Sequence, residues 1–399
     1  MDLSQPTRPR VLEVAPRFLP LIGGVPTHVN AIVEALHDFD FVVVKNLTRS
    51  EPDSFPPNLQ LISVGPVWRE PARNGIRRAA RMLLQGVAER IRWRNRNAIA
   101  RRLRPDLIHI HLIDQDYFWR VAGKLGLRGL ILRMVRYCAR VGRDPHKVVF
   151  TEHTLLSAPD SIVPEYIKDI VLEAFENIIC VERTSYMRAV DHRDRHGRPR
   201  NIWYIPNSVD TKAFSPHPFP KAPPLRIGVA SRIDKPGYAE VVSLARHLPD
   251  FAELWIAFSG DQSRIDKFRA ELGQHRFRLF ANIQPRDMPA FYSNIHVFFN
   301  QFPYTAIGRT TLEAMASGRP VVTFSHRGVD KYPVAPENGF LIHEWPTDML
   351  VTLAAMAEDP KLIEAKGHAA RKTIERTLSN ECLIPKLATA YREIMEISR

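Results

Sequence analysis

The sequence predicts an α/β protein of two domains, each built on a parallel β-sheet. Short apolar segments alternate with helix-like segments along the whole chain, which is typical of βαβ units. The stretch Pro206–Pro224 holds six prolines with little periodicity, and it predicts an interdomain linker near the middle of the chain. The length, 399 residues, also exceeds what a single hydrophobic core usually serves.

Short apolar runs in the first half predict buried strands. These runs are Val11–Val14, Phe41–Val44, Leu59–Val64, Leu107–Ile110, Val148–Thr151, Ile178–Val181 and Trp203–Ile205. Helix-like periodicity fills several of the intervals between them, at Thr27–Leu36, Gly75–Leu103 and Pro164–Phe175.

The second half repeats the alternation. Its strand candidates are Arg226–Ala230, Leu254–Phe258, Arg278–Ala281, Val297–Asn300, Pro320–Phe324 and Gly339–Ile342. Its helix candidates are Ala239–Arg246, Arg264–Leu272, Asp287–Tyr292, Arg309–Ala316, Asp348–Met356 and a long closing helix at Asn380–Ile397. We therefore expect two Rossmann-like domains with a cleft between them, and ligand-binding residues at the carboxyl ends of their strands.

The composition, 45% hydrophobic and 25% charged, is that of a soluble globular protein and excludes a disordered or collagen-like chain. No apolar run reaches the roughly 18 residues of a membrane-spanning helix, and the first residues lack the apolar stretch of a signal peptide. Three widely spaced cysteines, Cys138, Cys180 and Cys382, match no metal or redox motif. These observations predict a reduced, cytoplasmic location.

The net charge of +13 comes almost entirely from arginine, because only 13 of the 56 basic residues are lysine. Between Arg69 and Arg104 there are twelve arginines and two acidic residues, and Leu127–Arg143 adds five more arginines. Apolar residues interleave with both sets, as in helices that dock on anionic lipid. The alternative is a solvated basic face whose apolar stripe lies in the domain core. The sequence leaves both interpretations open.

Two glycines follow the first strand, in the segment Pro20–Val29. Gly23 and Gly24 let the backbone approach a ligand closely, and the helix after them offers unpaired N–H groups to an anion. The same pair also suits a tight connection that binds nothing.

The segment Tyr304–Pro320 is the most informative part of the chain. Gly308 permits a turn and Thr310 suits a helix start, so hydroxyl and N–H groups at this helix end can bind a phosphate. Glu313 lies in the first turns of the same helix. A surface carboxylate favoured by the helix dipole is the alternative interpretation.

Basic residues follow the first strand of the second half, in Ser231–Gly237. Arg232 and Lys235 can neutralise a diphosphate. A solvated turn with two exposed cations is the alternative interpretation.

Histidines end two strand candidates of the first half. His153 follows Val148–Thr151, whereas His109 and His111 share one face of a neighbouring segment. No third ligand accompanies these two in the sequence, so no metal site is predicted.

Together these segments resemble the retaining glycosyltransferases of the GT-B fold, in particular family 4 (glycosyl transferases group 1). The matching motifs are G-G-V-x-x-H-V from Gly23, P-D-x-x-H-x-H at Pro105–His111, the strand ending in His153, I-P-N-S-V-D at Ile205–Asp210, L-E-A-M-A-S-G-R-P-V-V at Leu312–Val322 and N-G-F-L-I at Asn338–Ile342. The resemblance implies an acceptor-binding domain at 1–207 and a nucleotide-sugar-binding domain at 208–379. A helix over 380–399 is then expected to pack back on the first domain.

The resemblance also implies an activity: transfer of a sugar from a UDP- or GDP-sugar to a hydroxyl acceptor, with retention and without metal or cofactor. The implied catalytic residues are His153, Arg232 and Lys235. The implied donor-binding residues are Gly23, Gly24, Arg232, Lys235, Thr305, Gly308, Arg309, Thr310 and Glu313. In this assignment Glu313 holds the ribose hydroxyls, Arg232 neutralises the diphosphate and His153 contacts the donor sugar.

Two positions depart from the family pattern. The first of the family's paired glutamates falls at Thr305, which leaves the sugar unidentified. The family's second basic residue falls at Gly237, so Lys235 is the candidate replacement.

The expected partners are a nucleotide-sugar donor, an acceptor that is a glycan, a lipid-linked molecule or a small molecule, and an anionic membrane surface. The expected location is the cytoplasm or the inner face of the membrane. Two other functions compete with catalysis. A catalytically silent sugar-nucleotide-binding partner protein is favoured by Thr305, and a basic nucleic-acid- or membrane-binding protein is favoured by the arginine content. No nucleic-acid-binding module accompanies the arginines, so no nucleic acid is expected.

Overall fold

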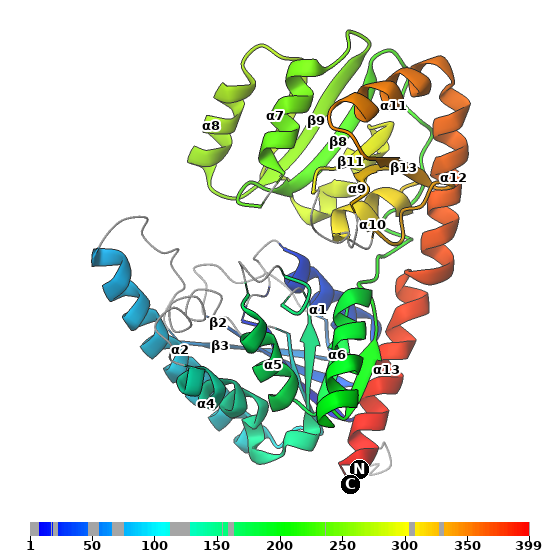
Figure 1. The fold of residues 1–399 in the computed structure, drawn as a ribbon. Helices are drawn as coiled ribbons and strands as arrows, with labels where there is room; N and C mark the ends of the chain where they lie inside the picture. The colour runs from blue at the N-terminus through cyan, green and yellow to red at the C-terminus, as the bar shows by residue number, and fades with distance from the viewer. Residues whose placement is uncertain are drawn as a thin grey trace. The chain divides into compact units, whose positions relative to one another are not determined.

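The computed structural model describes residues 8–16, 18, 23–46, 56–65, 76–111, 128–153, 155–158, 163–235, 237–302, 308–326 and 331–398, with side chains omitted over 76–88. The chain divides into two compact units (Figure 1). Unit 1 comprises Met1–Pro206 with Ile384–Arg399, and unit 2 comprises Asn207–Leu383. Within the described part of the chain, no helix is long and apolar enough to cross a membrane.

Unit 1 holds a seven-stranded sheet in the order β3-β2-β1-β4-β5-β6-β7, with every neighbouring pair parallel. Its strands are β1 (Arg10–Val14), β2 (Asp40–Asn46), β3 (Leu59–Val64), β4 (Leu107–Ile110), β5 (Val148–Glu152), β6 (Asn177–Cys180) and β7 (Asn201–Tyr204). Its helices are α1 (Gly24–Ala35), α2 (Ile76–Leu103), α4 (Arg128–Ala139), α5 (Glu165–Ala174), α6 (Arg183–His196) and most of α13 (Asn380–Ile397), with short 3₁₀ turns at Val141–Arg143 and Pro145–Lys147.

Helices cover both faces of this sheet, which is why its strands read as nearly continuous apolar runs. Leu12 and Ile108 point to the face that packs against α2, α4 and α5. Val11 and Leu107, one residue earlier, point to the opposite face, where α1 and Tyr391 of α13 pack. The last helix of the chain is therefore part of the core of unit 1.

Unit 2 holds a six-stranded parallel sheet in the order β10-β9-β8-β11-β12-β13. Its strands are β8 (Leu225–Arg232), β9 (Ala252–Ser259), β10 (Phe277–Ala281), β11 (Val297–Asn300), β12 (Val321–Phe324) and β13 (Gly339–Ile342). Its helices are α7 (Tyr238–His247), α8 (Gln262–Leu272), α9 (Met288–Ser293) after a 3₁₀ turn at Pro285–Asp287, α10 (Arg309–Ala316), α11 (Thr347–Glu358) and α12 (Pro360–Thr377). Helices α7, α8 and α11 cover one face, and α9, α10 and α12 cover the other.

The predicted α/β class is confirmed, and each predicted strand ends within two residues of an observed one. Three helices were not predicted: α4, α6 and α12. Helix α6 shows why, because polar and charged residues fill most of its positions and it buries only Ser185, Ala189 and His192. An apolar stripe this thin gives little helical periodicity in the sequence.

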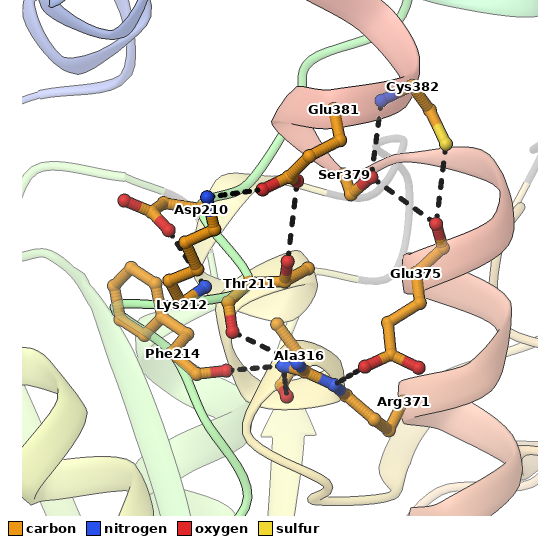
Figure 2. A network of polar contacts seen from close by, with 10 residues as sticks. All are labelled: Asp210, Thr211, Lys212, Phe214, Ala316, Arg371, Glu375, Ser379, Glu381 and Cys382. Carbon is orange, nitrogen blue, oxygen red and sulfur yellow. Dashed lines mark hydrogen bonds and ion pairs between the residues drawn. The ribbon is translucent and has the colours of Figure 1, made fainter.

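The proline-rich stretch belongs to unit 2 from Asn207 onward, rather than forming a free linker. Val209 pairs with Ser379, and the Arg371 guanidinium donates to the carbonyls of Thr211, Phe214 and Ala316 at 2.6–3.0 Å (Figure 2). These bonds tie the stretch to α10 and α12, and they give the carbonyls of Thr211 and Phe214 hydrogen-bond partners outside any sheet.

Candidate functional site

Both sheets reverse their strand order beside their first strand, between β1 and β4 in unit 1 and between β8 and β11 in unit 2. Ligands of open parallel sheets bind at the carboxyl ends of strands next to such reversals. The described site residues predicted from the sequence all follow strands at or next to these two places. Gly23, Gly24 and His153 belong to unit 1, and Arg232, Lys235, Gly308, Arg309, Thr310 and Glu313 belong to unit 2.

A buried polar cluster lies at the reversal in unit 1. Glu13 on β1 pairs in register with His109 on β4. The Glu13 carboxylate is 2.6 Å from His111 Nε2 and 3.0 Å from the Tyr391 hydroxyl of α13. His109 in turn is 2.5 Å from that hydroxyl through Nδ1 and 2.6 Å from Thr151 Oγ1 through Nε2.

One proton arrangement satisfies this cluster. His111 Nε2–H and the Tyr391 hydroxyl both donate to Glu13, His109 Nδ1–H donates to the Tyr391 oxygen, and Thr151 donates to His109 Nε2. Glu13 is then an ionised carboxylate with two donors. His111 Nδ1 keeps its lone pair, and no described residue donates a hydrogen bond to it.

The pKa values agree with this arrangement. Burial disfavours the charged form of Glu13, yet the two histidines beside it hold the pKa of its carboxyl well below the usual range. Burial, together with His109, lowers the pKa of His111 to about 4. His111 is therefore a neutral imidazole at pH 7, with one nitrogen held by Glu13 and the other available to a ligand.

Two further histidines surround His111. The His28 ring, from α1, lies 5.5 Å from the His111 ring, and the His153 ring lies 5.8 Å from it. The structure thus brings candidate third ligands, which the sequence did not reveal, close to His109 and His111. Two sets of residues offer ligand atoms within 4.8 Å of one another. One set is Glu13, His109 and His111, and the other is His28, His111 and His153.

Gly23 and Gly24 lie at the start of α1, as predicted. Gly23 is the residue before the helix, and its carbonyl accepts from the Thr27 hydroxyl at 2.9 Å. No side chain caps this helix end, and its first turn holds no acidic residue. The N-terminal N–H groups of α1 are thus suited to an anion.

Glu313 in unit 2 is buried, which rules out the alternative of a solvated surface carboxylate. The Tyr292 hydroxyl lies 3.0 Å from Glu313 Oε2 and 2.9 Å from the Thr310 carbonyl. Burial raises the pKa of Glu313, although Arg309 and the Tyr292 hydroxyl oppose this. Among the described residues the Tyr292 bond uses Glu313 Oε2, so Oε1 can accept from hydroxyl groups of a ligand.

The N-terminus of α10 is open to a ligand in the same way as that of α1. Gly308 precedes the helix, no side chain caps it, and its first turn holds no acidic residue. Arg309 fixes this end, because its guanidinium donates to the Ser208 carbonyl at 2.9 Å. Thr305 lies outside the described residues.

The basic pair predicted after β8 differs in its two members. Arg232 is about one third exposed and donates from Nε to Asp234 at 3.0 Å, so it already has a partner. Lys235 is exposed. Gly237 has φ +93°, and a Cβ there would lie 2.6 Å from the Gln301 carbonyl oxygen. A basic side chain is therefore excluded at the position where the family pattern expects one.

Sequence reasoning missed Glu13, His28, Tyr292 and Tyr391 as parts of these clusters. His28 stands in the G-G-V-x-x-H-V motif and could have been included on that ground. Glu13, Tyr292 and Tyr391 carry no local signal, because their partners lie 21 to 378 positions away in the chain.

Comparison with known proteins agrees with this geometry. Residues 209–373 match the family model described as glycosyl transferases group 1. Most of unit 2 thus matches this family, and the family resemblance found in the sequence is confirmed.

Relatives and solved structures extend the likeness to unit 1. A phosphatidylinositol N-acetylglucosaminyltransferase subunit from Homo sapiens is 26% identical over 206 residues, which cover 50% of this chain and 42% of the relative. The corresponding protein from Arabidopsis thaliana is 24% identical over 88% of this chain and 74% of the relative. The alignment thus spans less than half of the human protein.

Among solved structures, sucrose-phosphate synthase from Thermosynechococcus elongatus has a TM-score of 0.70 at 17% identity and covers 98% of this chain and 100% of its own. Anabaena HepE in complex with UDP-glucose has a TM-score of 0.63 at 15% identity, with coverage of 97% and 98%. These likenesses confirm the GT-B fold.

Proposed function

We propose that this chain is a retaining glycosyltransferase that moves a sugar from a nucleotide-diphosphate sugar to a hydroxyl acceptor. The observation that carries the proposal is the buried Glu313–Tyr292–Arg309 network at the N-terminus of α10, inside the matched family domain. In this proposal Glu313 binds the ribose hydroxyls, while the N–H groups of Arg309 and Thr310 bind phosphate oxygens. The reaction uses no metal or cofactor.

The mechanism follows from where charge develops. Cleavage of the bond to the diphosphate places negative charge on the leaving group and positive charge on the sugar. Arg232 and Lys235 neutralise the diphosphate, and Arg232 exchanges Asp234 for it. His153 contacts the sugar. The departing phosphate oxygen takes the proton of the acceptor hydroxyl on the same face, which gives retention.

The names of the relatives suggest N-acetylglucosamine as the sugar and a phosphatidylinositol-type lipid as the acceptor. Helix α4 supports an acceptor held at a membrane. Arg128, Arg133 and Arg136 are exposed on it, together with Leu130 at 46% and Tyr137 at 39%, and the helix has no acidic residue. Such a surface suits anionic lipid. We therefore propose a peripheral location at the cytoplasmic face, with further proteins of a complex as partners, as the relatives' names suggest.

Not all of the arginine-rich sequence is available to lipid. Arg92 and Arg96 of α2 are buried and pair with Glu89 at 2.7 and 2.8 Å. The arginines of 66–75 lie outside the described residues, and the side chains of 76–88 are not described.

A donor panel tests the proposed activity. Thermal shift and hydrolysis are measured with UDP-, GDP-, ADP- and TDP-sugars for the wild type, Glu313→Gln and Glu364→Gln. Glu364 is exposed on α12 and serves as the matched control. One donor is expected to stabilise the wild type and the control but not Glu313→Gln. If a donor binds but is not hydrolysed or transferred in any of the conditions used, the protein is instead a catalytically silent sugar-nucleotide-binding protein.

Vesicle sedimentation tests the membrane surface. Arg133→Glu with Arg136→Glu on α4 is compared with Arg264→Glu and Arg269→Glu on α8, which change the net charge equally. Binding to phosphatidylinositol vesicles is expected to fall only for the α4 pair. An equal loss of vesicle binding for both pairs, or tighter binding of the wild type to RNA than to vesicles, would contradict the proposed membrane surface on α4.

A further inference from the structure

Three histidines of unit 1 face one point beside the carboxyl ends of β4 and β5. The ring centroids of His28, His111 and His153 are separated by 5.2, 5.5 and 5.8 Å. Three imidazoles that bind one tetrahedral ion at about 2.0–2.1 Å have centroids about 5 Å apart. The observed spacing therefore matches a three-histidine site, with ligand atoms already within 4.8 Å of one another.

The hydrogen bond that holds the His111 ring is also typical of a metal-binding histidine. Its Nε2 is held 2.6 Å from the Glu13 carboxylate, and its buried Nδ1 accepts no hydrogen bond from the described residues. Histidine ligands commonly have one nitrogen on the metal and the other donating to a carboxylate, which fixes the ring and its tautomer. Glu13 is itself fixed by Tyr391, so the ring orientation is set before any ion arrives.

We propose that His28, His111 and His153 form a binding site for one divalent transition-metal ion of the zinc type, with Glu13 positioning His111. Three neutral imidazoles suit Zn²⁺ and leave a fourth coordination position open to solvent or substrate. His109 is not a ligand, because Tyr391 and Thr151 occupy both of its nitrogens. His153 is the partly exposed member of the three.

The consequence for activity depends on the proposed function. If His153 contacts the transferred sugar, an ion on the same side chain competes with the donor. Zinc is then an inhibitor, and a chelator restores activity. Binding itself requires nothing from unit 2 or from catalysis.

Calorimetry with Zn²⁺ and the visible absorption of Co²⁺ measure binding directly in the full chain. The wild type is expected to bind one ion, with the intense absorption of a tetrahedral site. His28→Gln, His111→Gln and His153→Gln are each expected to abolish this signal. Glu13→Gln is expected to weaken binding by about 10- to 100-fold. Thermal melting without metal shows that each variant is folded.

His196→Gln is the matched control, because His196 is an exposed histidine of the same unit whose ring lies near that of His192 on α6. The control is expected to bind like the wild type. Loss of binding in the control, or binding unchanged in His111→Gln, overturns the site. Activation by Zn²⁺ would overturn the inhibitory role alone. If no nucleotide-sugar donor binds, the proposed glycosyltransferase function is contradicted. The calorimetric measurement then still decides whether the three-histidine metal site exists.

Discussion

The two units reverse strand order in the same way, yet the polar residues at the two reversals differ in kind and in burial. In unit 1 the polar groups stand on the strands themselves or directly after them, as Glu13, His109 and His111 do, and all three are buried. In unit 2 the groups come from a helix end, from the last residue of β8 and from the turn after it. Arg232 there is about one third exposed and is paired with Asp234.

The difference concerns how each site is kept in place. The side chains of unit 1 are fixed by hydrogen bonds to neighbouring strands and to Tyr391, so folding sets their geometry. Arg232 pairs with Asp234, two residues further along the chain, and it can exchange this partner for a ligand. We therefore expect substitutions in the first cluster to affect stability most, and those in the second to affect ligand binding most.

Glu13→Ala is expected to give the largest effect. It leaves His111 and Tyr391 buried without their common acceptor, and breaking such a buried network costs about 3–5 kcal/mol in the free energy of unfolding. Urea denaturation measures the change. Glu34→Ala, at an exposed position of α1, is the control and should change stability little. A loss below about 1 kcal/mol for Glu13→Ala would show that the cluster is not rigid.

Tyr391→Phe is expected to have an intermediate effect. Removing the hydroxyl leaves His109 Nδ1–H without an acceptor, which costs about 1–3 kcal/mol. Tyr238→Phe in unit 2 is the matched change, because its hydroxyl bonds Glu271 at an exposed position. The free energy of unfolding of that variant should fall by less than about 1 kcal/mol. Equal losses in the two variants would remove the contrast between the units.

Acid is expected to destabilise unit 2 through His296. Burial, with smaller contributions from Arg226 and Arg319, lowers the pKa of His296 to about 4, although its bond to the Pro220 carbonyl opposes this. Between the ordinary value near 6.5 and about 4, the unfolded chain binds a proton that the folded chain does not. Stability is therefore fully present above pH 6.5 and falls by about 1.4 kcal/mol per pH unit as the pH drops.

Urea denaturation from pH 7 to pH 4 measures this slope. His296→Gln should reduce the slope by about 1.4 kcal/mol per pH unit, leaving the part that comes from other groups such as His111, whose pKa is also lowered. His196→Gln, at an exposed position, should leave the slope unchanged. A slope of the same size in His296→Gln would contradict the assignment.

Arg232→Ala is expected to have the smallest effect on stability, under about 0.5 kcal/mol, because its ion pair is partly exposed to solvent. Donor affinity should nevertheless fall by about tenfold or more, since a charge-assisted bond to phosphate is lost. Denaturation and donor binding are measured on the same variant, beside Arg269→Ala on α8. A large stability loss with unchanged affinity would assign Arg232 to the fold instead.

The sequence predicted most of the fold, but only some members of each polar cluster. Apolar strands buried on both faces give clear runs, so β1 to β13 were located from the chain alone. The α10 segment was located through Gly308 and Glu313. The partners of Glu13 and Glu313 were not, because Tyr391 and Tyr292 arrive from distant elements.

Close packing also decides what motif spacing cannot. The spacing placed a basic residue of the family pattern at Gly237, but only the contact with Gln301 shows why a side chain is excluded there. Likewise, Arg319 in the matched L-E-A-M-A-S-G-R-P-V-V motif gave no sign of its role. It is buried and donates to the carbonyls of Tyr292 and His217, so it holds the fold.

The most direct test of the central claim is the anomeric configuration of the product. UDP-N-acetylglucosamine and phosphatidylinositol vesicles are incubated with the wild type, Glu313→Gln and Glu364→Gln, and the product is examined by NMR. We expect an α-linked product, as in the donor, from the wild type and Glu364→Gln and none from Glu313→Gln. A β-linked product, or equal turnover by Glu313→Gln, would contradict it.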